Sequence, residues 1–344
     1  MQIVKVRFVF FTICAMLCIS GLVFSQKEKG KIKLYPVVVK GKWGYIDNKG
    51  KTVIKPQFES AGYYIDSLAV VKINNKYGFI DRMGNVVIKP IYELAYYFSN
   101  GLAAVKVNDK WGYINKKGEE VITPKFEYTN FFNDSLAAVI IGGKCGYIDE
   151  NGNIIIVPEY KNPTYFSEGL APVDSLGKYG YINKRGVFII NPVFDFALPF
   201  TEGLGLIKVD NRYGFINTIG KIVVMPQYEI ANSFKDGVAA VKVSEKYGYT
   251  DKEGRYIIQP QYEDAYNFSE GLARVKYKTR WCYIDVNGFI RLTTNYDVVS
   301  DYLGEVAMVR FKDRIGYINK QGKLIWKSEK MKSDDLDSIL RDCL

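Results

Sequence analysis

A glycine-centred motif that recurs every 34 residues limits what this chain can fold into. The nine central positions follow one another without an insertion or deletion. A fixed period of this size is typical of repeat proteins, in which each unit is one supersecondary element that leaves apolar surface for its neighbours to cover. The nine positions are Gly44, Gly78, Gly112, Gly146, Gly180, Gly214, Gly248, Cys282 and Gly316.

Each copy contains three short runs rich in Val, Ile, Tyr and Phe, separated by turn residues, and this pattern predicts β-strands. Between the second and third runs, Asp or Asn is followed three residues later by Gly, as in Asp47 and Gly50. This spacing is typical of a type I turn, in which the side chain caps the turn and glycine takes a positive φ. Frequent Gly and Pro leave no room for two helices per unit, which excludes a tetratricopeptide array. The sequence therefore predicts an all-β fold.

Aromatic residues recur at fixed positions and indicate how the units pack. The residue after the central position is Tyr or Phe in all nine copies, and two later positions are aromatic in all eight copies that have them. In a strand, Gly112 faces away from Trp111 and Tyr113. We therefore expect an aromatic side chain of a neighbouring unit to fill the space beside the glycine. The predicted structural core includes Trp43, Gly44, Tyr45, Gly78, Trp111, Gly112, Tyr113, Gly146, Gly180, Gly214, Gly248, Trp281 and Gly316.

The core K-W-G-Y-I-D-x-x-G, with V-I-x-P-x-[FY]-E downstream, resembles the bacterial WG-containing (KWG-type) repeat family over about residues 34 to 326. The resemblance implies a tandem β-repeat protein that is often exported. It implies no established catalytic activity and no catalytic residues to transfer. The last two copies depart from the pattern: Cys282 replaces the Gly, Thr294 replaces the Pro, and Asp301 to Glu305 is irregular. Degenerate terminal copies are expected of caps.

Two arrangements of the array at residues 34–327 stay open. We expect an open, twisted, solenoid-like array of nine hairpin or three-stranded repeats, because propellers usually have four to eight blades of four strands. The alternative is a closed, propeller-like ring. Residues 26–33 are expected to form a linker, and the tail at 328–344 has apolar residues at a spacing that a small capping helix would use.

The first 25 residues have the order of a secretory signal peptide. Lys5 and Arg7 precede an uncharged stretch from Phe8 to Phe24, and cleavage is expected before Gln26. An uncleaved membrane anchor is the alternative. No later stretch is long and apolar enough to span a bilayer. We therefore expect an exported protein that is periplasmic, at the cell surface or secreted.

Charge indicates the class of partner. Removing Lys5 and Arg7 leaves 47 − 2 = 45 basic residues against 37 acidic ones, a net charge of +8. A positive field favours acidic partners, either a protein or an anionic glycan. Export argues against nucleic acid. Cys145, Cys282 and Cys343 remain after signal removal and do not form the framework of a small disulfide-rich domain.

The chain contains no histidine, which removes the most usual general base and the commonest zinc ligand. A carboxylate follows the downstream aromatic in most copies, with Lys161 as the exception. Glycosidases need two carboxylates about 5–10 Å apart, but a residue that recurs in nearly every copy is typical of scaffold. We predict no enzyme, no metal and no cofactor. The recurring carboxylates are Glu59, Glu93, Glu127, Asp195, Glu229, Glu263 and Asp297.

A basic residue precedes the central position by two in every copy. Stacked repeats would align these cations as a binding stripe for a polyanion. The alternative is that each cation pairs with a repeat carboxylate or covers an aromatic ring with its aliphatic stem. We predict a non-catalytic binding or scaffolding module of the cell envelope, with a glycan- or wall-binding protein and, less favoured, a carboxylate-based hydrolase as alternatives. The stripe comprises Lys42, Lys76, Lys110, Lys144, Lys178, Arg212, Lys246, Arg280 and Arg314.

Overall fold

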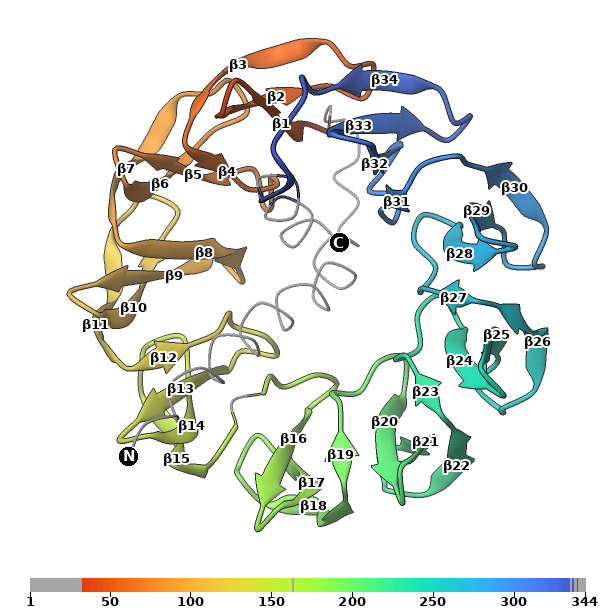
Figure 1. Cartoon of the computed structure of the whole chain (residues 1–344). Coiled ribbons are helices and arrows are strands. Elements are labelled where there is room, and N and C mark those ends of the chain that lie inside the picture. Colours follow the sequence, from red (N-terminus) through yellow and green to blue (C-terminus); the bar gives the residue numbers. More distant parts are fainter. Residues whose placement is uncertain (1–32, 163, 335, 337–338, 340–344) are drawn as a thin grey trace, which may run out of the picture. The chain divides into compact units, whose positions relative to one another are not determined.

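A computed structural model of the chain describes residues 33–162, 164–334, 336 and 339 (Figure 1). The predicted signal peptide at 1–25 and nearly all of the predicted linker lie outside the described residues. The chain divides into two compact units: unit 1 contains Met1–Gln57 and Phe268–Leu344, and unit 2 contains Phe58–Asn267. Within the described ranges, no helix has the length and apolar character needed to cross a membrane.

Unit 2 is built from consecutive small antiparallel sheets, ordered from a short strand (two residues, but six in β8) through the first and second strands to a third, outermost strand (Figure 1). The sheet of β16 is described with three strands, and residue 163, which precedes it, lies outside the described residues. The sheets are β4 (Ser60–Ala61), β5 (Ala69–Ile73), β6 (Lys76–Ile80), β7 (Val86–Tyr92); β8 (Leu94–Ser99), β9 (Leu102–Val107), β10 (Lys110–Asn115), β11 (Glu120–Phe126); β12 (Tyr128–Thr129), β13 (Ala137–Ile141), β14 (Lys144–Ile148), β15 (Ile154–Tyr160); β16 (Leu170–Ser175), β17 (Lys178–Asn183), β18 (Phe188–Phe194); β19 (Phe196–Ala197), β20 (Leu204–Val209), β21 (Arg212–Asn217), β22 (Ile222–Tyr228); and β23 (Ile230–Ala231), β24 (Ala239–Val243), β25 (Lys246–Thr250), β26 (Tyr256–Tyr262), followed by β27 (Asp264–Ala265).

Unit 1 contains the first sheet of the chain and its last ones. The strands are β1 (Tyr35–Val39), β2 (Lys42–Ile46) and β3 (Thr52–Phe58); β28 (Ala273–Tyr277), β29 (Arg280–Ile284) and β30 (Ile290–Thr293); and β31 (Val298–Val299), β32 (Val306–Phe311), β33 (Arg314–Asn319) and β34 (Leu324–Lys327). Four strands per sheet, the short strand included, is the build of a β-propeller blade. The sequence predicted three strands because a two-residue strand leaves no recognisable pattern.

The turns between strands follow from side-chain chemistry. The Asp or Asn after each second strand accepts hydrogen bonds from two backbone N–H groups of its own turn, as Asp47 does from Lys49 at 2.8 Å and Lys51 at 2.9 Å. The glycine three residues later has a positive φ, which is 83° at Gly50. The predicted capped turn is therefore confirmed. In the first eight copies, the first and second strands are joined by two-residue turns with positive φ at both positions, such as Asn108 and Asp109. This is the type I′ geometry that suits tight hairpins.

The central glycine is required by its own sheet, which corrects the expectation that a neighbour's aromatic ring fills the space beside it. Between Tyr247 and Tyr249, the register with the third strand shifts and that strand bulges. A Cβ on Gly248 would lie 2.5 Å from the carbonyl oxygen of Ile258 and 2.7 Å from the nitrogen of Pro260. Proline fits the bulge because no ladder hydrogen bond is needed from its nitrogen. Glycine and proline thus form a matched pair.

The eighth copy has neither member of the pair, whereas the ninth keeps Gly316 with Ser328 in place of the proline. Cys282 pairs with Thr293 and Tyr283 pairs with Leu292, so no bulge faces the cysteine. Thr294, which replaces the proline, donates its backbone N–H to the carbonyl of Trp281 at 2.9 Å. The third strand pairs regularly here and accommodates the cysteine side chain at the central position. The two substitutions of this copy, Cys282 and Thr294, therefore compensate for each other.

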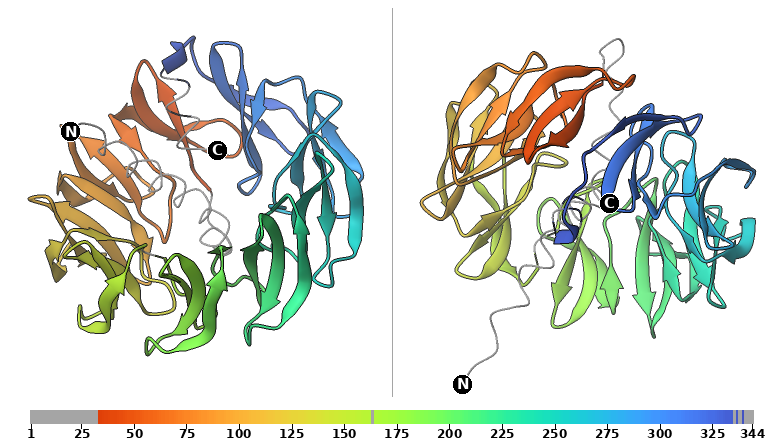
Figure 2. Two further views of the ribbon diagram at one scale, coloured as in Figure 1. Left: turned by 60° about the horizontal axis from the view of Figure 1, so that its bottom comes forward. Right: turned by 45° about the horizontal axis from the view of Figure 1, so that its top comes forward.

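Each hydrophobic core in unit 2 is shared by two consecutive sheets, which appear as successive layers in Figure 2. The ring after the central glycine packs on a ring that precedes the first strand of the next sheet. The Tyr147 and Phe166 centroids, for example, lie 4.8 Å apart. A hydroxyl often adds an anchor, as Tyr181 donates to the carbonyl of Leu198 at 2.8 Å. The expectation that neighbouring units complete one another's interiors is confirmed.

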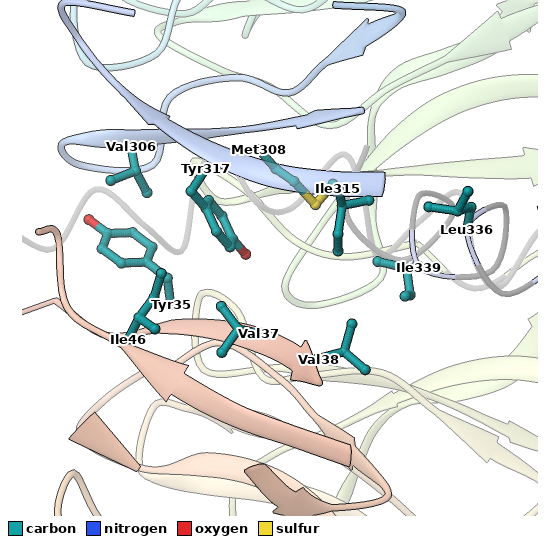
Figure 3. Close-up of a cluster of buried hydrophobic side chains, with 10 residues drawn as sticks. All are labelled: Tyr35, Val37, Val38, Ile46, Val306, Met308, Ile315, Tyr317, Leu336 and Ile339. Atoms are coloured by element: carbon teal, nitrogen blue, oxygen red, sulfur yellow. The ribbon is translucent and has the colours of Figure 1, made fainter. Parts of the chain in front are cut away.

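Within unit 1, the first and last sheets share a core of buried apolar side chains (Figure 3). The rings of Tyr35 and Tyr317 lie 6.0 Å apart, and the Tyr317 hydroxyl donates to the carbonyl of Pro36 at 2.9 Å. Leu336 and Ile339 from the predicted tail are buried in this cluster and have helical backbone. An open array would leave its first and last sheets uncovered. The contact therefore supports the closed, propeller-like alternative rather than the open, solenoid-like array.

We predict that Gly248→Ala destabilises the fold by at least about 2 kcal/mol, because the new Cβ meets backbone that cannot move aside as a side chain would. In the matched control, Cys282→Ala, the cost is about 1 kcal/mol, because this central position already holds a side chain and no new contact forms. Thermal unfolding followed by circular dichroism checks both. Equal losses in the two variants would contradict the proposed glycine–proline pairing.

A second prediction concerns acid stability. Partial burial alone would raise the pKa values of Asp81, Asp149, Asp251 and Asp285, but hydrogen bonds from turn N–H groups and neighbouring side chains outweigh it and lower them. A lowered folded-state pKa adds stability above the unfolded-state pKa of about 3.9, and this stability is lost as pH falls through the folded-state value.

Four copies hold the same turn with asparagine, as at Asn115. A variant with all four aspartates changed to Asn should therefore fold, and its melting temperature should fall less than that of the wild type between about pH 5 and pH 2. Parallel melting curves for the two proteins would show that these aspartates do not control acid stability.

Candidate binding surface at the strand hairpins

Every basic residue of the predicted stripe begins the second strand of a sheet, directly after the tight hairpin. Eight of them are exposed, and Arg314 is half-buried. In unit 2, six of these cations occupy equivalent positions of successive sheets: Lys76, Lys110, Lys144, Lys178, Arg212 and Lys246. The structure therefore places the stripe residues at one end of each second strand. Their affinity for an anion stays a prediction.

The recurring carboxylate holds the hairpin of the following sheet. Glu93 accepts the backbone N–H of Asn108 on one oxygen at 3.0 Å and that of Asp109 on the other at 3.1 Å. Consecutive N–H groups of this kind form a small anion-binding nest. The other carboxylates that accept hairpin N–H groups are Glu59, Glu127, Asp195, Glu229 and Asp297. This use explains why the carboxylate recurs.

Two cations of the stripe pair with these carboxylates. Lys178 lies 2.5 Å from Asp195, and Arg212 lies 3.8 Å from Glu229. The hydrogen bond from Lys178, followed by that from the Asp210 N–H, lowers the pKa of Asp195. At these two positions, the cation therefore pairs with a repeat carboxylate, which was the alternative to a binding stripe.

A different row of lysines, not singled out from the sequence, covers the ring before the central position. The Lys208 ammonium lies 5.2 Å from the centroid of Tyr213, its cross-strand partner. A cation over a ring face is attracted by the ring quadrupole. Its only signal in the sequence was the Lys that follows the L-A-x-V run. The same arrangement occurs for Lys72 with Tyr77, Lys242 with Tyr247, and Lys276 with Trp281.

The predicted structural core residues are buried, except that Trp43 and Trp281 are half-buried. A further set of acidic residues, which sequence reasoning missed, links sheets at the turns before the first strands. Glu168 and Glu202 each accept the N–H of a glycine 35 residues later, at 3.0 Å for both Gly203 and Gly237. Nothing in a single copy reveals this role, because donor and acceptor belong to different copies.

The chemistry available to this surface is recognition by charge. Both oxygens of Glu93 and of Glu127 are engaged by hairpin N–H groups. Burial raises the pKa of Cys145 to about 12, so its thiol is not ionised near neutral pH. Across the described ranges, no three His, Cys, Asp or Glu side chains are grouped so as to hold a metal. The exposed lysine and arginine side chains are the groups best placed to contact a ligand.

We predict that Glu127→Ala frees the hairpin at Gly142 and Gly143, so that both amides exchange with solvent about tenfold faster. Lys161→Ala serves as the matched control, since residue 161 holds the same position one sheet later but has no carboxylate. Lys161→Ala should leave the exchange rates of the Leu176 and Gly177 amides unchanged. Unchanged protection of Gly142 and Gly143 in Glu127→Ala would show that the carboxylate does not secure the hairpin.

Comparison with known proteins places this chain among repeat proteins. The model of the WG containing repeat matches residues 43–77, 77–111, 111–145, 146–179, 179–213, 213–247 and 247–281. No curated protein matches the chain.

Among solved structures, a crystal structure of the eukaryotic initiation factor is 11% identical, with a TM-score of 0.59 over 88% of this chain and 96% of the other. The C-terminal WD40 domain of Sif2 is 10% identical, with a TM-score of 0.45 over 84% of this chain and 98% of that domain. The first likeness shows a shared fold alone. Because the family model covers more than half of the chain, the protein belongs to the WG containing repeat family.

Proposed function

We propose that this protein is an exported, non-catalytic binding module of the cell envelope that contacts an acidic partner through its strand hairpins. The observation that carries the proposal is the exposed cation at the start of the second strand in eight of nine copies. Most other recurring residues have a structural task, in a turn, a bulge or a shared core. The order of residues 1–25, typical of a signal peptide, supports export.

A hydrolase is the weaker candidate because its carboxylates would have to be available to substrate. General acid and base catalysis requires a group that can exchange a proton with the reacting atoms. The recurring carboxylates instead accept hydrogen bonds from backbone, two each at Glu93 and Glu127. Their oxygens are therefore committed to the fold.

A glycan-binding role has one observation in its favour. Tyr97, Phe131 and Tyr165 are half-buried and occupy the same position of three consecutive copies in unit 2. Their centroids are separated by 5.9 Å and 5.7 Å. Rings that keep part of their surface exposed offer an apolar contact for a sugar. This candidate differs from the main proposal because it needs rings rather than cations.

The two candidates respond differently to salt. The mature chain should bind an immobilised acidic peptide about tenfold more weakly when the ionic strength is raised about tenfold, because screening shortens the reach of surface charge. A triple variant, Lys76→Glu, Lys110→Glu and Lys246→Glu, should lose binding. The matched control reverses three exposed lysines of the third strands and their turns, Lys55, Lys89 and Lys221, and should bind nearly as well. Salt-independent binding to a neutral polysaccharide, lost when Tyr97 and Tyr165 become Ala, would favour the glycan candidate.

Export is tested on the full chain in its native cell. Removing residues 2–25 should retain the protein in the cytoplasm, whereas the intact chain should appear outside it and shortened near residue 26. Recovery of the intact chain in the cytoplasm at full length would contradict the envelope location.

A further inference from the structure

One junction in unit 2 departs from the pattern of the others, between the sheet of β12–β15 and the sheet of β16–β18. Lys161 follows β15 at the position where other copies have a carboxylate. In a repeat protein, such a departure marks a place where the requirements of the scaffold have been relaxed or replaced.

The equivalent junctions show what normally occupies this place. One sheet earlier, Glu127 accepts the N–H groups of Gly142 and Gly143 at 2.7 Å and 3.1 Å. At the hairpin of Leu176 and Gly177, Asp174 of the same sheet accepts the Gly177 N–H at 2.8 Å. Within the described part of the chain, no carboxylate accepts the N–H of Leu176. A carboxylate therefore accepts only one of the two hairpin N–H groups here, whereas Glu127 accepts both in the preceding junction.

The charge at this junction is reversed. Lys178 is paired with Asp195 at 2.5 Å, and Lys144 and Lys161 occupy the equivalent two positions one sheet earlier. Both lysines are exposed, and neither forms an ion pair with any residue that the structure describes. Two cations thus stand where the next junction has a cation and an anion. Such a pair attracts an external carboxylate.

Leu176 adds an apolar contact. It is 99% exposed and has a φ of 54° at the tip of the hairpin. Leucine is an unusual residue for this left-handed conformation, which Asn, Asp and Gly adopt more readily. The other hairpins of unit 2 have Asn, Gly, Asp or Ser at this position: Asn74, Asn108, Gly142, Asp210 and Ser244.

We propose that this junction, formed by Lys144, Lys161 and the Leu176–Gly177 hairpin, docks an acidic segment of a partner protein. A carboxylate of that segment takes the place that Glu127 takes in the preceding junction, and a neighbouring apolar side chain packs on Leu176. Asp174 lies on the same hairpin and disfavours a densely charged polyanion. The inference deepens the proposed function and rests on it, since it assigns the partner class and the site.

The first test uses a fluorescein-labelled peptide of alternating Glu and Leu, with fluorescence anisotropy on the full mature chain. Lys161→Glu restores the internal carboxylate, so it should weaken binding by about tenfold or more while keeping or raising the melting temperature. Lys89→Glu makes the same charge change on β7, away from the junction, and should change affinity less than about twofold.

Two further variants distinguish binding at this junction from a general effect of positive charge. Leu176→Asn places at the tip a residue that the hairpins at Asn74 and Asn108 already use, so it should fold and weaken the peptide by about tenfold. Glu127→Lys creates a similar charge pair with Lys110 in the preceding junction, but the hairpin there has Gly142 at its tip. It should therefore add no second site of comparable affinity, and the stoichiometry should stay at one peptide.

Equal losses in Lys161→Glu and Lys89→Glu would overturn the assigned site but leave the basic surface of the proposed function in place. Failure of the wild type to bind the peptide, alongside salt-dependent binding of an anionic polysaccharide, would overturn the partner class as well. Loss of binding only in the triple variant of the stripe would place the contact elsewhere on the hairpins.

Discussion

The packing of one aromatic ring from each sheet against a ring from the next is the interaction on which this structure depends. The centroids are 4.9 Å apart for Phe79 and Phe98, and 4.6 Å apart for Phe215 and Phe234. Since each core is assembled from two copies, no sheet has a complete interior of its own. An insertion within a copy would move the second ring away from the first. This dependence accounts for a period that is kept without a single slip.

A chain of shared cores leaves an unpaired face at each end unless the ends meet. In unit 1, Tyr317 packs on Tyr35, and its hydroxyl reaches the carbonyl of Pro36. Leu336 and Ile339 fill the edge of the same cluster. The seam between the first and last sheets thus also packs ring against ring. Tyr35, however, lies within the first strand, where the other copies have Ala or Gly, and not before it. Closure therefore combines a repeat residue, Tyr317, with residues particular to the first copy and to the tail.

Strands and turns were predictable because their signals are local. The Asp or Asn, the glycine three residues later and the alternating apolar runs each act within a few residues. The environment of the central glycine was mispredicted, although proline at a fixed distance within the third run already indicated a bulge. The task of Glu93 was beyond single-copy reasoning, since it depends on a hairpin 15 residues away in the next sheet. Local structure can be predicted from the sequence, whereas contacts between copies can be identified only once the packing of the sheets is known.

Departures from a strict repeat carry more information about function than the repeat itself, provided that compensated exchanges are set apart. Cys282 and Thr294 lie in the same copy, and the third strand of that copy pairs regularly. This departure from the repeat is therefore explained by the structure of the sheet alone. At Lys161 the compensation is partial. Asp174 recovers one hairpin hydrogen bond, but Lys144 gains no anion and Leu176 gains no cover. The sheet folds without a partner for the Lys144 charge and without a cover for Leu176. An unneutralised charge beside an exposed apolar side chain is typical of a surface that binds a partner.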